Sequence, residues 1–81
     1  MQIVIVRFTD STTFGHWASV EEVERRKPKI CVAAGVLVEE NEELIKIALL
    51  CSMDGGEYAN WVVIPTPWVI SCDVIKEVAN D

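Results

Sequence analysis

Five short apolar segments, separated by residues that favour turns, constrain this chain more than any other feature. The segments are residues 3–8, 29–39, 43–53, 58–64 and 68–75, and each contains several β-branched or aromatic side chains. Runs of this kind favour strands, whereas the double glycine within 54–57 and the two prolines within 65–67 interrupt a sheet. The pattern therefore predicts an all-β fold of five strands.

A short helix is predicted between the first two of these segments. Ser19 and Glu22 have the spacing of a capping box, in which the hydroxyl accepts a hydrogen bond from a free amide at the helix start and the glutamate reaches back to another. Over residues 20–26 the acidic side chains come first and the basic ones last, as the helix dipole prefers. We expect this helix, through its two valines and with Trp17, to cover one end of the sheet.

The two longest segments form a predicted hairpin. Residues 40–42 are polar and join them, and a short polar connection between apolar runs favours a turn. Gly35 lies within the first of the two segments. A residue without a Cβ allows a long strand to bend sharply and serve both sides of a barrel, and a plain turn glycine is the alternative. The expected fold is a small, strongly bent five-stranded barrel with one short helix after the first strand.

The whole chain, residues 1–81, is expected to form one domain, because so short a chain can bury only one core. Hydrophobic residues make up 51% of it. A domain of this size exposes much of its surface, so it cannot hide all of these side chains. We therefore expect part of the apolar surface to lie between the subunits of a homo-oligomer.

The charge balance is acidic, with 13 Asp and Glu against 7 Lys and Arg and a formal net charge of −6. An acidic domain repels the phosphate backbone, which supplies most of the non-specific affinity for nucleic acid. The charge therefore argues against general coating of DNA or RNA. Four of the bases gather at Arg25, Arg26, Lys27 and Lys29; a solvated helix end explains them, and contact with phosphate is the alternative.

The cysteines indicate neither a disulfide framework nor a metal site. Cys31, Cys51 and Cys72 are odd in number, widely spaced and without a C-x-x-C pair. We expect buried free thiols, no metal and a reducing cytoplasm. A Cys–His nucleophile would require folding to bring His16, the single histidine, to a cysteine. No other pattern indicates catalysis, so the sequence predicts a non-enzymatic protein without a cofactor.

The first seven residues lack the basic region, the longer apolar stretch and the cleavage site of a signal peptide. No apolar run reaches the roughly 20 residues that a membrane-spanning helix requires. We therefore expect neither export nor membrane association.

Several local patterns follow one another in an order typical of one family. They are residues 10–11, Trp17, 20–22, Cys31, 34–39, 45–49 and 63–65, followed by the apolar pairs 69–70 and 74–75. In this order nearly the whole chain resembles the small Sm-like proteins carried by bacteriophages and prophages. The resemblance implies an Sm-like or SH3-like barrel. Two departures argue against RNA binding more than against the fold: the predicted helix follows the first strand instead of preceding it, and the expected RNA-reading polar pattern is missing from the loops.

The candidate ligand-binding residues are polar side chains of the predicted loops, because loops on a rigid scaffold carry most recognition groups. They are Asp10, Ser11, Thr12, Thr13, His16, Tyr58 and Asn60. Each of them also suits a turn, which is the alternative. Trp61 and Trp68 are the candidate interface residues, since an indole offers a large contact area at little entropic cost. Packing within the core is the alternative for both tryptophans and for Trp17.

Two functions are open from the sequence. The first is an oligomeric binding module whose subunit loops bind RNA ends or nucleotides, although the net charge disfavours RNA as a partner. The second is a phage accessory or assembly protein that acts on a host protein without a small ligand, for instance by strand addition at a sheet edge. A polar pocket at a subunit seam would favour the first function, and an exposed aromatic patch would favour the second.

Overall fold

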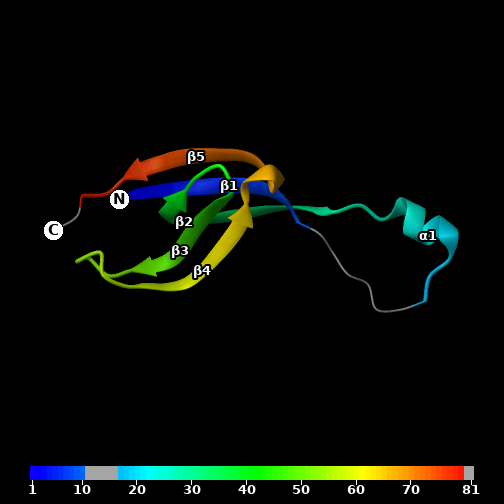
Figure 1. Ribbon diagram of the computed structural model, residues 1–81, viewed down its shortest axis with the longest axis horizontal. Coiled ribbons are helices and arrows are strands. Elements are labelled where there is room, and N and C mark those ends of the chain that lie inside the picture. The colour runs from blue at the N-terminus through cyan, green and yellow to red at the C-terminus, as the bar shows by residue number, and fades with distance from the viewer. Residues whose placement is uncertain (11–16, 80–81) are drawn as a thin grey trace.

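The computed structural model describes residues 1–10 and 17–79, and these form five strands and one α-helix (Figure 1). The strands are β1 (Gln2–Asp10), β2 (Lys29–Glu40), β3 (Leu44–Cys51), β4 (Tyr58–Pro65) and β5 (Val69–Glu77). The helix α1 (Val20–Arg25) precedes β2, and a 3-10 turn, η1 (Thr66–Trp68), precedes β5. The predicted all-β class, the five strands and the short helix after the first strand are confirmed.

All five strands belong to one antiparallel sheet with the order β4-β3-β2-β1-β5. The two outer strands, β4 and β5, do not pair with each other in the described part of the chain. The sheet is therefore open and has two free edges, where the sequence predicted closure into a barrel.

The core lies between strands that are not neighbours in the sheet. Val4 and Val6 of β1 pack with Ile45 and Ile47 of β3 and with Ile64 of β4. Because β2 lies between β1 and β3, these contacts require the sheet to fold back on itself across β2. Several partly buried side chains extend this core, namely Phe8, Ala33, Leu37, Val69 and Cys72.

β2 is the strand about which the sheet folds. Its residues 29–36 pair with β1, whereas its residues 36–40 pair with β3, so the strand changes partners at Val36. Gly35 lies directly before this point, and a Cβ added there would clash with the backbone carbonyl oxygen of Ala48 in β3. The absence of a side chain at Gly35 is therefore required for this close approach. β2 thus has different partners before and after Val36, but the barrel whose two sides it was expected to serve is not closed.

α1 begins where the capping pattern predicts, but it lies away from the sheet. The Ser19 hydroxyl accepts a hydrogen bond of 3.2 Å from the backbone N–H of Glu22. Figure 1 shows α1 beyond the ends of β1 and β2, apart from the other strands. None of the residues of α1 is buried, and Trp17 before it is 100% exposed. The expectation that α1 and Trp17 cover an end of the sheet is wrong, because the extended chain from Arg26 into β2 carries the helix outward.

The position of α1 makes the molecule elongated. Its principal extents are 56 × 21 × 20 Å, and the radius of gyration is 16.1 Å. A compact chain of this length has a radius of gyration of about 12 Å. The segment around α1 thus projects from the sheet.

Two further expectations concerned membrane-spanning helices and the state of the cysteines. Within the described residues, no α-helix combines the length and the apolar character that crossing a membrane requires. The three cysteines are free, as predicted, but each is only half-buried.

We expect Gly35→Ala to lower the free energy of unfolding by about 1–3 kcal/mol, because the new methyl group would press on rigid backbone at Ala48. Urea unfolding followed by circular dichroism measures this change. Ala34→Ser, at the exposed neighbouring position, is the matched control and should change stability by no more than about 0.5 kcal/mol. A Gly35→Ala protein as stable as the wild type would contradict the close approach of β2 and β3.

Candidate functional site

An open cavity of ≈ 280 Å³ lies against β2, β3 and β4. Its lining residues are Val38 of β2, Lys46 of β3, and Tyr58 and Trp61 of β4. The indole of Trp61 is 59% exposed and Tyr58 is 41% exposed, so both aromatic side chains are accessible to a ligand. These four residues are termed the Trp61 hollow.

A left-handed residue in β4 brings two aromatic side chains to this hollow. Tyr58 and Trp61 are three positions apart, and in a regular strand residues an odd number of positions apart point to opposite faces. Asn60 lies between them with a φ of 54°, in the region that residues other than glycine rarely adopt. The local turn of the backbone at Asn60 accounts for both side chains lining one cavity.

A second backbone irregularity lies on the opposite wall. In the β2–β3 ladder, Leu37 pairs with Ile47 and Glu39 pairs with Lys46, so Val38 has no partner and forms a bulge. A bulge changes the direction of a side chain relative to the regular alternation of a strand. Val38 is thereby placed in the wall of the hollow, while Glu39 lies across from Lys46.

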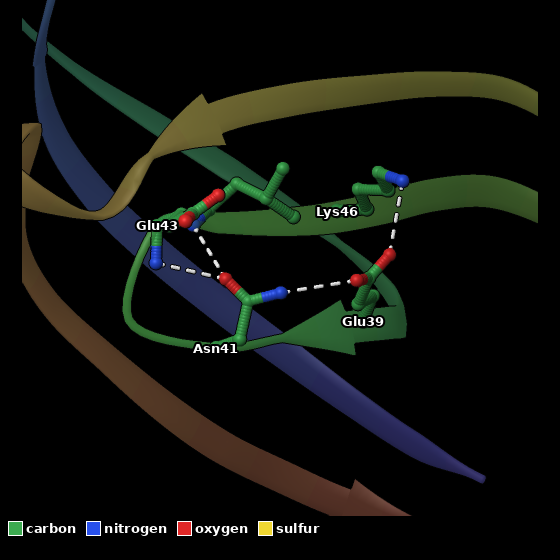
Figure 2. Close-up of polar contacts among 5 residues, drawn as sticks. Glu39, Asn41, Glu43 and Lys46 are labelled. Atoms are coloured by element: carbon green, nitrogen blue, oxygen red, sulfur yellow. Dashed lines mark hydrogen bonds and ion pairs between the residues drawn. The ribbon is translucent and has the colours of Figure 1, made fainter.

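A fixed pair of charges adjoins the aromatic walls. Figure 2 shows the ammonium of Lys46 at 2.9 Å from one carboxylate oxygen of Glu39, while the side-chain amide of Asn41 donates to the other at 3.0 Å. The amide oxygen of Asn41 accepts hydrogen bonds from the backbone N–H groups of Glu43 and Leu44, at 2.8 and 3.0 Å. Asn41 thus fixes both the β2–β3 turn and the carboxylate that holds Lys46.

The hollow combines two kinds of recognition group. Its aromatic side chains offer flat apolar faces for stacking. Lys46 of the hollow is a hydrogen-bond donor, and Glu39, which pairs with it outside the lining, is an acceptor; both remain partly exposed. This set suits a planar ring that has donors and acceptors on its edge. Among the described residues, no group of three or more His, Cys, Asp and Glu side chains could hold a metal ion.

The predicted site residues do not form one cluster in the described structure. Tyr58 and Trp61 meet at the hollow, and Asn60 shapes the strand between them. Asp10 ends β1 opposite Lys29, on the far side of β2 in the strand order. The remaining loop candidates, Ser11, Thr12, Thr13 and His16, lie outside the described residues.

Trp68 is partly exposed in η1 and lines a different open cavity, together with Thr9, Pro28 and Ile70. It does not contribute to the Trp61 hollow. The interface roles predicted for Trp61 and Trp68 stay predictions.

Sequence reasoning missed Val38, Lys46 and Glu39. Val38 reads as one apolar residue among many, and nothing in its neighbours signals the bulge. Lys46, a charged residue within an otherwise apolar strand, was the one available signal. Its strand, β3, is the neighbour of β4, which carries Tyr58.

The Cys72 thiol is not activated as a nucleophile. Burial raises the pKa of the Cys72 thiol, and the negative charge of Glu40 raises it further. A thiol with a raised pKa stays protonated at neutral pH and is a poor nucleophile. The histidine that the sequence offered as its partner, His16, lies outside the described residues.

The turn between β3 and β4 has a structural role. The Ser52 hydroxyl donates to the Asp54 carboxylate at 2.6 Å, and the Gly56 backbone N–H donates to the same oxygen at 2.9 Å. These two hydrogen bonds lower the pKa of Asp54. Gly55 has a φ of 76°, which a glycine adopts without steric cost. The double glycine therefore forms the turn that the sequence predicts.

No protein-family model, curated protein or solved structure matches this chain.

Stability should depend on pH through Asp54. Its folded-state pKa is lowered, so its stabilising contribution is present above the unfolded-state value of 3.8 and is lost as the pH falls through the folded-state value. Asp54→Asn should therefore reduce stability at about pH 7 and differ less from the wild type at about pH 2.5. Urea unfolding of both proteins at the two pH values measures this. An equal difference at both would show that the charge of Asp54 does not matter.

The backbone at Asn60 leads to opposite effects of two substitutions. Asn60→Gly should preserve or raise stability, because glycine tolerates a positive φ, whereas Asn60→Val should lower it by about 1–2 kcal/mol. Thermal unfolding of the two variants compares these effects. Ala59→Val, at an adjacent exposed position with regular pairing, is the control and should be nearly neutral. If valine is tolerated at Asn60 as well as at Ala59, the left-handed conformation does not shape β4.

Proposed function

We propose that this protein is a small Sm-like binding module that self-associates and holds the base of a nucleotide, or of an RNA end, in the Trp61 hollow. The observation that supports this most is the meeting of Tyr58 and Trp61, two exposed aromatic side chains, in one cavity beside the Lys46–Glu39 pair. Stacking of a base on an aromatic side chain contributes about 1–3 kcal/mol.

The charges favour a single base over a long polyanion. A net charge of −6 repels an extended phosphate backbone. Lys46 is paired with Glu39, so the hollow offers no unopposed positive charge to phosphate. The edge of a nucleobase carries both donors and acceptors, which match the carboxylate and the ammonium. The volume of ≈ 280 Å³ is close to the lower end for small-molecule sites.

Self-association is supported by the surface of the sheet. Both outer strands, β4 and β5, offer unpaired backbone groups, and natural proteins usually cover such edges. Large apolar side chains are exposed on several strands; they include Ile30, Val32, Leu49, Leu50, Val63, Ile70, Val74 and Ile75. An Sm-like arrangement of subunits would remove part of this surface from water. Three free cysteines suit a reducing compartment, and we place the protein in the cytoplasm.

A second candidate function is that of a phage accessory or assembly protein that engages a host protein without a small ligand. The observation in its favour is the fully exposed Trp17 beside the exposed valines of α1. An accessible aromatic side chain next to apolar neighbours is typical of protein interfaces. The two functions differ in one respect: only the first requires the Trp61 hollow.

Ligand binding at the hollow is tested in a Trp17→Phe/Trp68→Phe background, in which Trp61 is the single tryptophan. Adenosine and uridine monophosphates should quench its fluorescence in a saturable manner, because a stacked base alters the environment of the indole. Tyr58→Ala in this background should weaken binding about tenfold or more. Leu50→Ala, an exposed side chain of β3 outside the hollow lining, is the matched control and should not alter the affinity. The absence of quenching by every nucleotide at millimolar concentration would contradict the ligand-binding function.

A further inference from the structure

Among the described residues, the segment that carries α1 leaves its large apolar side chains exposed. Residues 17–29, here termed the arm, include Trp17, Val20 and Val23, which are 100%, 72% and 62% exposed. α1 has six residues, and a helix this short is marginal in water without packing against another surface. None of the described strands covers α1 (Figure 1). These apolar side chains are therefore available to a surface outside the sheet.

The charges of the arm are opposite to those of the rest of the molecule. The arm holds four of the seven Lys and Arg residues, at positions 25, 26, 27 and 29. Ten of the thirteen acidic residues lie outside it, and the densest group is the β2–β3 turn, where four of the five residues 39–43 are glutamates. One chain thus has a basic projection and an acidic turn.

Among the ion pairs seen for the described residues, none joins the basic group to the acidic group. They flank β2, the basic group at its start and the acidic group at its end. Arg26 of the basic group pairs with Glu22 of α1, and Glu39 of the acidic group pairs with Lys46 of β3. Among the described residues, Arg25 and Lys27 have no ion pair. An open cavity of ≈ 420 Å³, lined by Asn41, Glu42 and Glu43, is accessible at the turn.

We propose that the arm of one copy docks on the β2–β3 turn of a second copy. The basic side chains of the arm enter the cavity at Glu42 and Glu43, and the apolar side chains of α1 are covered against the second copy. In a two-fold dimer each copy provides one arm and one turn, so the contact forms twice and leaves neither group unpaired. The proposal rests on the self-association part of the proposed function, and it does not depend on what the Trp61 hollow binds.

A second copy fits the arm better than an unrelated partner, because complementary charges occur on this one chain. A net charge of −6 would otherwise oppose association of two identical chains. Pairing the basic arm with the acidic turn replaces this repulsion with attraction at the contact. Since the groups are exposed, salt should weaken the dimer, with screening over about 10 Å at 0.1 M ionic strength.

The test is a charge-exchange experiment with the full chain. Arg25→Glu/Lys27→Glu makes the arm acidic, and Glu42→Lys/Glu43→Lys makes the turn basic. Each variant alone should dissociate at least tenfold more readily than the wild type in analytical ultracentrifugation, because like charges meet at both contacts. An equimolar mixture should regain the dimer, since both arm–turn contacts are then between opposite charges. Combining all four substitutions in one chain should restore the homodimer.

One control and one further test separate the docking contact from general effects. Glu57→Lys/Asp73→Lys changes the net charge as much as the turn variant but lies outside residues 39–43, so it should leave the dimer intact. Val20→Thr/Val23→Thr keeps the shape of the exposed valines and should weaken the dimer by removing apolar contact. Circular dichroism of each variant checks that the sheet remains folded.

The outcomes distinguish this inference from the proposed function. A monomeric wild type at low salt would overturn both the arm contact and self-association. An oligomer that all charge variants leave unchanged would overturn the arm contact while preserving self-association, and a mixture that stays monomeric would also overturn the arm contact. Nucleotide quenching of Trp61, measured on the dissociated variants, reports on the hollow independently.

Discussion

The close approach of β2 to β3 at Gly35 is the constraint on which the rest of the structure depends. β2 pairs with β1 up to Val36 and with β3 from Val36 onward, so the sheet folds across this one strand. The backbone of Ala48 occupies the space that a side chain at Gly35 would need. Only because the two backbones meet there can the valines of β1 reach the isoleucines of β3 and β4 and exclude water.

The core formed by this fold is small, and much of the apolar composition stays outside it. Five aliphatic side chains make up the buried cluster, whereas large apolar side chains on β2, β3, β4, β5 and α1 remain exposed. An open sheet has two edges, and an elongated molecule has more surface than a compact one of the same length. This exposed apolar surface is the observation on which the proposed self-association rests, and the basic arm and acidic turn lie at the two ends of β2.

The candidate site arises from departures from regular strand geometry. A bulge at Val38 and a left-handed residue at Asn60 change the side-chain alternation of two strands on opposite sides of β3. Left-handed backbone in a residue other than glycine costs of the order of 1–3 kcal/mol and persists where the surroundings maintain it. Here the result is a pair of aromatic side chains, Tyr58 and Trp61, in one cavity beside a fixed ion pair. Regular strands would have placed the two rings on opposite faces.

The sequence by itself determined the strands, the turns and the start of the helix, because these depend on local interactions: β-branched runs, the double glycine before β4, and the hydroxyl of Ser19. It also indicated Tyr58 and Asn60 as residues of interest, though as loop side chains. Only the tertiary structure decided that the sheet stays open, that α1 projects from it, and that Val38 and Lys46 join Trp61. These features depend on which strands meet across β2 and on a one-residue change of register in the β2–β3 ladder. Both involve residues that are distant in the chain, so the local sequence does not signal them.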